Sequence, residues 1–228
     1  MNKNKKIDII NQKIRRKKGL LTLSTAVLAE NNIIEFKAGL SPASKFDVTP
    51  SKETKFSYEL GTEYRYLVTE NTELGVGLTY QNHGKLKKFI DVEDTNLRVE
   101  VSDTELYDSL PLYATVKYNF RNNSDIVPYI KADLGYSFNI NGNNQSRYKT
   151  YSKITGAVVD EGKLKDLKAQ NGMYCSLGTG LVYKGFTAGL SYQVNTAKIE
   201  GIRYDGVKDK GSANFRRFTL SFGYQFRF

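Results

Sequence analysis

Cysteine and histidine are almost absent from this sequence: Cys175 and His83 are the single examples among 228 residues. One cysteine cannot form an intramolecular disulfide, and no group of His, Cys, Asp and Glu has the spacing of a metal site. Beyond residue 29, no apolar run approaches the roughly 20 residues that a membrane-spanning helix needs. We therefore expect neither a metal nor another cofactor, and we predict no membrane-spanning helix after residue 29.

The excess of positive charge is concentrated at one end of the chain. The whole sequence has a net charge of +10, but residues 1–29 contain eight Lys or Arg and one Asp. The remainder has 26 positive and 23 negative residues, a net charge of +3. Because no clustered basic stripe with interleaved aromatics remains to follow a phosphate backbone, nucleic acid is not an expected partner.

Residues 1–29 have the three parts of a secretory signal peptide. A basic region precedes a short apolar run at 19–26, and the segment Val27-Leu28-Ala29 places small residues where cleavage before Glu30 requires them. The basic region is longer than usual for such a leader, which leaves the true start codon open. We predict a signal peptide at 1–29 and one mature domain at 30–228.

The mature sequence contains about eight segments in which apolar and polar residues alternate. A period of two is typical of β-strands and not of helices. The segments are 34–40, 56–66, 74–80, 110–120, 130–138, 173–183, 186–194 and 214–228. Short turns at 69–71, 121–125 and 184–185 alternate with long polar connections, at 82–108, at 141–170 and around 205–211. We predict an all-β, antiparallel, up-and-down barrel with short turns at one end and long loops at the other.

The apolar face of these segments is sorted by depth. Its middle carries small or aliphatic residues, such as Leu60, Val76 and Ala114, and its ends carry aromatics, such as Tyr66 and Tyr136. Aromatic rings prefer the polar boundary of a bilayer, so two aromatic bands around an aliphatic one indicate a lipid-facing surface. The alternative fold is a soluble barrel of the lipocalin kind. Its core would give no reason to sort residues by depth. We therefore predict a transmembrane barrel, which satisfies every backbone group in lipid.

The polar face of the same segments then lines the interior. Its charges are nearly balanced in sign, as they must be if they are to pair in a low dielectric. An eight-stranded barrel is only just wide enough for side chains to fill. We predict a lumen plugged by ion pairs and keep a narrow conduit for small solutes as the alternative. The predicted lumen charges are Glu35, Lys37, Glu59, Glu63, Arg65, Glu73, Lys117, Lys131, Asp133, Arg217 and Arg227.

The last predicted strand ends in a recognisable pattern. Ser221, Gly223, Phe226 and Phe228 form a sequence of a polar residue, a glycine and two apolar residues, which resembles the closing signal of bacterial outer-membrane barrels. With the signal peptide, the strand number and the alternation of loops and turns, this pattern makes the chain similar to the small eight-stranded proteins of the OmpA transmembrane domain, OmpX and opacity-protein type.

This resemblance implies an integral protein of the bacterial outer membrane, in contact with outer-membrane lipid and lipopolysaccharide. It also implies that the barrel-assembly machinery reads the closing signal and that the protein is a monomer. Members of this family serve as envelope anchors, adhesins, host-surface binders or narrow conduits. Unlike OmpA, this chain shows no peptidoglycan-binding domain after the barrel, which argues against a cell-wall tether.

His83 and Cys175 are the two residues with chemistry of their own. Some outer-membrane barrels use a His and a Ser near the outer leaflet, so a lipid-modifying enzyme is an alternative function. No motif places a second catalytic residue near His83, and we expect a solvated turn histidine and no enzymatic activity. The alternation places Cys175 against lipid, where we expect it to be inert.

The long connections are the remaining candidates for function. The 82–108 segment is rich in acidic residues, and its alternation at 96–101 suggests that strands continue beyond the membrane. The 141–170 segment leans basic through Arg147, Lys149, Lys153, Lys163, Lys165 and Lys168. We predict an adhesive rim that binds a host or surface ligand and whose basic groups meet lipopolysaccharide phosphates. Solvated loops that protect strand edges from aggregation are an equal alternative.

Overall fold

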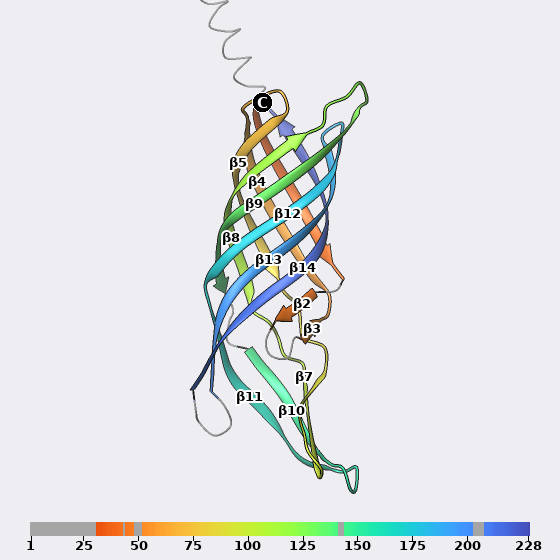
Figure 1. Ribbon diagram of the computed structural model, residues 1–228, viewed down its shortest axis with the longest axis vertical. Coiled ribbons are helices and arrows are strands. Elements are labelled where there is room, and N and C mark those ends of the chain that lie inside the picture. Colours follow the sequence, from red (N-terminus) through yellow and green to blue (C-terminus); the bar gives the residue numbers. More distant parts are fainter. Residues whose placement is uncertain (1–30, 43, 48–51, 141–143, 203–207) are drawn as a thin grey trace, which may run out of the picture.

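The computed structural model describes residues 31–42, 44–47, 52–140, 144–202 and 208–228, which form one sheet of fourteen strands (Figure 1). Eight of these described strands close into an antiparallel barrel, which confirms the predicted fold. They are β1 (Asn32–Ser41), β4 (Ser57–Leu67), β5 (Thr72–Asn82), β8 (Asp108–Asn119), β9 (Ile126–Ile140), β12 (Gly172–Tyr183), β13 (Phe186–Ile202) and β14 (Lys208–Arg227). In the same residues, no helix is long and apolar enough to cross a membrane. The predicted signal peptide, residues 1–29, lies outside the described part.

The barrel closes between its first and last strands. β14 pairs with β1 from Arg227, opposite Ile33, to Leu220, opposite Leu40, and its other edge pairs with β13. Backbone hydrogen bonds in both directions between Asn32 and Phe228, of 3.2 and 3.0 Å, extend this seam to the last residue. Each barrel strand therefore has a partner on both sides, as a bilayer requires.

The two faces of the barrel differ as the alternation predicted. On β8, Leu112 is exposed, whereas the side chains of Thr115 and Lys117, which have the opposite parity, are buried. Leu134 and Leu177, in the aliphatic band, are 62% and 67% exposed. An apolar exterior around a polar interior is the arrangement of a barrel whose solvent is lipid.

The sheet continues beyond the barrel at its long-loop end (Figure 1). There β2 (Ser44–Asp47) and β3 (Lys52–Thr54) follow the edge of β14. Beside β13, the sheet continues with β11 (Val158–Gln170), β10 (Asn144–Ser152), β7 (Leu97–Ser102) and β6 (Phe89–Glu93), in that order. We call these last four strands the loop sheet. Strand β7 confirms the continuation predicted from the alternation at 96–101.

Two stretches that we predicted as loops are strands. The 141–170 connection contains the β10–β11 hairpin, and Lys210 and Gly211 belong to β14. Both stretches lie beyond the barrel, where neither face of a strand has to be apolar, so the period-two signal is missing from their sequence. Residues 141–143 and 203–207 of these predicted loops lie outside the described residues.

A small apolar core lies over the long-loop end of the lumen. Its buried members are Phe46, Leu86, Leu106, Tyr107, Ala197 and Phe215, and we call this cluster the cap. Phe46 and Tyr107 contact edge to face, with ring centroids 6.4 Å apart. Phe215 has the same inward parity on β14 as Arg217, so the cap stands directly on the polar interior.

Candidate functional sites in the lumen and on the loop sheet

Arg65 of β4 is the centre of the first group of charges in the lumen. Its Nη2 lies 2.6 Å from Glu35 Oε2 of β1, its Nε lies 2.8 Å from Glu73 Oε2 of β5, and its Nη1 contacts Glu63. The Arg65 side chain is fully buried, and none of the three carboxylates is more than 8% exposed. A guanidinium carries five N–H donors in one plane, so a single arginine can hold carboxylates from three strands.

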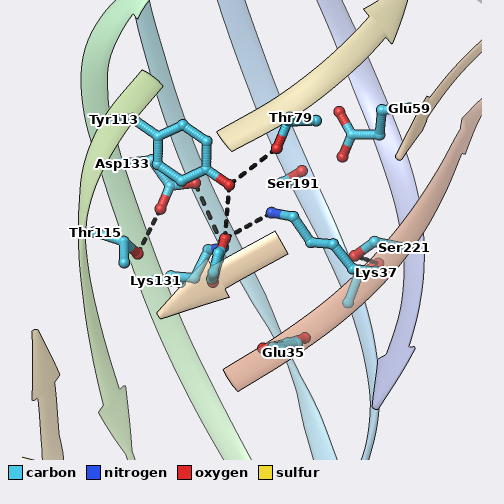
Figure 2. A network of polar contacts seen from close by, with 12 residues as sticks. Glu35, Lys37, Glu59, Thr79, Tyr113, Thr115, Lys131, Asp133, Ser191 and Ser221 are labelled. Carbon is cyan, nitrogen blue, oxygen red and sulfur yellow. Dashed lines mark hydrogen bonds and ion pairs between the residues drawn. The ribbon is translucent and has the colours of Figure 1, made fainter. Parts of the chain in front are cut away.

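Glu63 connects this group to a second one. Its Oε1 accepts hydrogen bonds from Lys37 Nζ at 2.7 Å, from Lys131 Nζ at 2.5 Å and from Tyr113 Oη at 2.9 Å. Lys131 Nζ also lies 3.5 Å from Asp133 Oδ2. Figure 2 shows the Lys37 and Tyr113 side chains reaching from different strands toward one point in the lumen. Cations from β1 and β9 thus share one carboxylate of β4.

A third group lies nearer the cap. Arg217 Nη2 is 2.6 Å from Glu59 Oε2, and Arg217 Nε donates to Gln193 Oε1 at 2.9 Å. The amide groups of Gln81 and Gln193 donate to the same Glu59 carboxylate at 3.1 and 3.2 Å. A buried ion pair needs further hydrogen bonds to its remaining atoms. The glutamines provide them for Glu59 and for Arg217 Nε, whereas the buried Arg217 Nη1 has no hydrogen-bond partner among the described residues.

The structure places nearly all of the predicted lumen charges inside the barrel. Glu35, Glu59, Glu63, Arg65, Glu73, Lys117, Asp133 and Arg217 are buried, and the Lys37 and Lys131 side chains are 8% and 13% exposed. Arg227 differs from the prediction, because its side chain is 42% exposed and lies 3.8 Å from Glu73 Oε1. Its strand ends at that residue, so the side chain reaches the mouth of the short-turn end.

Large interior tyrosines were missed by the search for charges. Tyr113, Tyr129 and Tyr174 are buried inside the barrel, and Lys117 Nζ lies 4.4 Å from the centroid of the Tyr129 ring. Their parity alone could have identified them, since each stands between two outward-facing residues. Beside Tyr129, a cavity of about 20 Å³, lined also by Ser176, has room for about one water molecule.

His83 is buried, so the prediction of a solvated turn histidine was wrong. Its side chain is 0% exposed, its ring centroid lies 4.0 Å from that of Phe215 and 5.0 Å from that of Tyr107, and its Nε2 is 2.7 Å from Ser109 Oγ. The residue directly follows β5. Burial holds the pKa of the imidazole well below its usual range, and the positive charge of Arg217 adds a smaller effect in the same direction. The His83 and Ser109 pair therefore faces the interior and the cap, not the lipid.

The residues of the closing signal alternate across β14. Phe226 and Phe228 are 52% and 49% exposed on the outer face, and Ser221 and Gly223 have the inward parity. A Cβ on Gly223 would lie 2.6 Å from the carbonyl oxygen of Phe36, so this position tolerates only glycine without a shift of β1. Cys175, on β12, is exposed on the outer face, where its parity placed it.

The two long segments meet in the loop sheet. β7 of the acidic segment pairs with β10 of the basic one, with Glu100 opposite Lys149. Lys153 Nζ lies 3.1 Å from Glu93 Oε1, and Lys149 Nζ lies 3.3 Å from Glu161 Oε2. Opposite charges thus neutralise each other within one structure. Lys165 and Lys168, also predicted as basic rim residues, lie outside the residues whose side chains are described.

The far end of the loop sheet carries exposed apolar side chains. Ile154, in the turn between β10 and β11, is 80% exposed, and Val159 is 56% exposed. Lys153 N donates to Asn96 O at 2.8 Å, which brings the β6–β7 turn beside the β10–β11 turn. Val92, Leu97 and Val158 are 48%, 40% and 45% exposed. Val158 pairs with Tyr151 and Leu97 pairs with Ser152, so these side chains are distributed over both faces of the sheet. We call Val92, Leu97, Ile154, Val158 and Val159, which together surround the end of the loop sheet, the tip patch.

A closed eight-stranded barrel with a lipid-facing exterior and an ionic interior defines an integral outer-membrane protein. Residues 19–226 match the outer membrane protein beta-barrel domain, and the chain belongs to this family. It is a small β-barrel protein of the bacterial outer membrane. The short-turn end is then periplasmic, and the long-loop end, with the cap and the loop sheet, is extracellular.

Several known proteins are similar to this chain. The uncharacterized protein PM1543 of Pasteurella multocida (strain Pm70) is 28% identical over 233 residues, which cover 92% of this chain and 94% of that protein. Among solved structures, Neisserial surface protein A is 17% identical with a TM-score of 0.45, covering 86% of this chain and 97% of that one. OprG of Pseudomonas aeruginosa is 15% identical with a TM-score of 0.44, covering 88% and 98%. Ail, the attachment invasion locus protein of Yersinia pestis, is 13% identical with a TM-score of 0.40, covering 86% and 99%.

Proposed function

We propose that this protein is a non-enzymatic surface-interaction protein, in which a plugged barrel holds an adhesive loop sheet outside the cell. The observation that carries the proposal is the continuous pairing from barrel strand β13 through β11, β10 and β7 to β6. A ladder of this kind transmits the rigidity of the barrel to the tip patch, so little conformational entropy is lost when the patch binds a partner.

The composition of the tip patch favours a protein partner. Its aliphatic side chains, of which Ile154 is the most exposed, have charged neighbours in the sequence, since Glu93 and Asp94 follow Val92 and Lys153 precedes Ile154. An exposed apolar patch with a polar rim is typical of a protein interaction site. The partner we propose is a protein on a host cell or another surface.

A plugged lumen supports this role over that of a conduit. The three groups around Arg65, Glu63 and Glu59 connect strands across the interior, and the cap stands over their extracellular side. An enzyme acting on lipid is disfavoured because His83 and Ser109 are each 0% exposed. A substrate would have to displace the cap before reaching either side chain.

Adhesion of cells that display the protein tests this proposal. Bacteria of a non-adherent laboratory strain, making equal surface amounts of each variant, would be counted on cultured epithelial monolayers after washing. The unmodified protein should raise adhesion several-fold over the empty vector, and the triple change Val92→Ser, Ile154→Ser and Val159→Ser should remove most of the increase.

The matched control is Lys149→Ser with Glu161→Ser. This pair lies on the same sheet, and its removal leaves the net charge and the tip patch unchanged. It should keep the adhesion of the unmodified protein. Equal adhesion of the unmodified protein and the tip variant would refute the assignment of binding to the tip patch.

A further inference from the structure

His83 lies at the boundary between the cap and the polar interior. Its ring centroid is 4.0 Å from that of Phe215 and 5.0 Å from that of Tyr107, and both of these rings belong to the cap. Its Nε2 is 2.7 Å from Ser109 Oγ, which is buried inside the barrel. A titratable side chain thus contacts an apolar cluster with its ring faces and a polar one with its ring nitrogen.

The hydrogen bonds around His83 suit a neutral imidazole and not a protonated one. An imidazolium has an N–H on both ring nitrogens. The Nε2–H can donate to Ser109 Oγ, because the Ser109 hydroxyl donates to Gln81 Oε1 at 3.3 Å. The buried Nδ1 has no hydrogen-bond partner in the part of the chain that the structure describes. A proton on Nδ1 would therefore be buried without an acceptor, and exposure to water would remove that cost.

The charges below His83 oppose its protonation. Arg217 of β14 has the same sign as an imidazolium, and its guanidinium carbon lies 5.9 Å from the centroid of the same Phe215 ring. Glu59 of β4 is already held by Arg217 Nη2 at 2.6 Å and by hydrogen bonds from two glutamines. Two cations would therefore meet at one aromatic ring, with the nearby carboxylate engaged by the first of them.

The charged side chains on the other elements near the imidazole are also engaged. On β8, Asp108 accepts hydrogen bonds from two side chains of β5 at 2.7 and 2.9 Å. In the connections that follow β5 and precede β8, Lys85 pairs with Glu105 at 2.7 Å, and both side chains are about half exposed. Lys45 and Asp47 of β2 have the outward parity. These acids already have donors or face outward, so none of them compensates a charge on the imidazole.

The cap is the part of the structure that can separate from His83. The cap strands β2 and β3 have only four and three residues, and the connections 84–88 and 103–107 are joined by isolated bridges and single backbone hydrogen bonds. The barrel strands have 10 to 20 residues and a partner on both edges. Local opening takes place where pairing is shortest, so the cap opens before the barrel does.

We propose that His83 makes the cap an acid-sensitive switch, which opens when the imidazole is protonated and closes when it is neutral. In the open cap the imidazole meets water and has its usual pKa of 6.5, whereas burial and Arg217 lower the pKa in the closed cap. The closed cap is thus favoured above pH 6.5. Each pH unit below 6.5 favours the open cap by a further factor of about ten, until the closed-state pKa is reached.

Opening changes the extracellular surface and leaves the barrel wall intact. It uncovers the apolar rings of Phe46 and Phe215, which are 3% and 0% exposed in the closed cap. Phe89 of β6 and Ala169 of β11 pack against the cap. The loop sheet therefore loses one of its contacts with the barrel when the cap opens.

Hydrogen exchange of the folded full chain in detergent micelles, followed by mass spectrometry at pH 7.5 and 5.5, tests this switch. Labelling times are scaled to the slower intrinsic exchange at the lower pH. Peptides that cover 84–88 and 103–107 should then exchange about tenfold faster at pH 5.5, whereas 112–116 in the barrel wall should keep its protection. The acceleration should be absent from His83→Gln. The matched control is Lys85→Gln, which removes an exposed charge from the same connection and should respond like the unmodified protein.

Three results would overturn the switch: equal protection of the cap at both pH values, the same acceleration in His83→Gln, or equal acceleration of the cap and the wall, which would mean that the whole protein unfolds. If His83→Gln loosens the cap at both pH values, the ratio of its two exchange rates remains the readout. Because His83 is the single histidine in the chain, ¹³C-labelled histidine gives one imidazole signal in NMR spectra. Its midpoint should lie below pH 6.5, and it serves if His83→Gln fails to fold. A midpoint at or above pH 6.5 would also overturn the switch.

Discussion

Arg65 and Glu73, on the neighbouring strands β4 and β5, lie 2.8 Å apart in a part of the lumen where neither side chain is exposed. The same guanidinium also contacts Glu35 and Glu63. Burying an unpaired charge in this environment would carry a large desolvation cost. Each charged side chain of the lumen therefore depends on pairing with the others. The interior is therefore a connected network in which the loss of one member affects several partners.

The first prediction is that Arg65→Ala destabilises the barrel strongly. Three carboxylates lose their common cation, and breaking a buried ion pair on one side costs on the order of 3 kcal/mol. The measurement is the urea midpoint in detergent micelles, followed by the difference in gel migration between folded and boiled protein.

Arg98→Ala is the matched control for this change. Arg98 pairs with Glu100 at 2.7 Å on the loop sheet, and 43% of the Arg98 side chain is exposed. Glu100 is buried but also contacts Lys88, so it keeps a cation in the variant, and the loss of the half-exposed Arg98 should cost less than about 1 kcal/mol. Equal urea midpoints for the Arg65 and Arg98 variants would show that the lumen network does not stabilise the fold.

The second prediction concerns acid sensitivity through His83. The pKa of this buried imidazole is lowered below its usual 6.5, so the unfolded chain binds a proton at a pH where the folded one does not. The stability from this group is complete above pH 6.5 and decreases as the pH falls toward the folded-state pKa, by up to about 1.4 kcal/mol per pH unit.

The test compares the unmodified protein with His83→Gln at pH 7.5 and 5.5. The loss of stability between the two pH values should be smaller in the variant, because glutamine does not titrate. Other titrating groups are common to both proteins and cancel in the difference. An identical loss in both proteins would mean that His83 is not buried as a neutral group.

The third prediction uses the close contact at Gly135. A Cβ there would lie 2.1 Å from the Leu112 carbonyl oxygen and 2.5 Å from Tyr113 Cα. Gly135→Ala should therefore push β8 away from β9 and displace Tyr113 from Glu63, at a cost of about 2 kcal/mol or more. Gly211→Ala, where a Cβ meets nothing within 4 Å, should leave the urea midpoint unchanged. If the two variants unfold at the same urea concentration, the packing between β8 and β9 is looser than described.

The fourth prediction concerns the end of the chain. Deletion of Phe228 removes the backbone hydrogen bonds to Asn32 and an exposed ring. If Phe228 is part of the signal read by the assembly machinery, its loss should lower the amount of protein in the outer membrane more than it lowers the folding yield in detergent. Immunoblots of outer-membrane fractions and the gel shift measure the two quantities. Normal outer-membrane levels of the truncated chain would contradict the assembly role.

The barrel could be predicted from the sequence because each of its strands has one face in lipid. Leu112, Ala114 and Val116 alternate with polar residues on β8, and that pattern specifies both the strand and its orientation. The β10–β11 hairpin could not be predicted in this way, since both of its faces are largely polar and its stability comes from pairing with β7 and β13.

The burial of His83 was also beyond local sequence patterns. Its neighbours Asn82 and Gly84 are typical of a turn, whereas Phe215 and Tyr107, which cover its ring, come from distant positions in the chain. Only the closure of the barrel brings these three segments together. The register of the lumen charges was easier to predict, because parity alone separates interior from exterior side chains.

The measurement that tests the account most directly is the conductance of the purified protein in a planar bilayer. If the groups around Arg65, Glu63 and Glu59 fill the lumen beneath the cap, the unmodified protein should show little or no steady current. A steady, ion-selective current that is reproducible across preparations would contradict the plugged lumen and assign the protein to the narrow conduits.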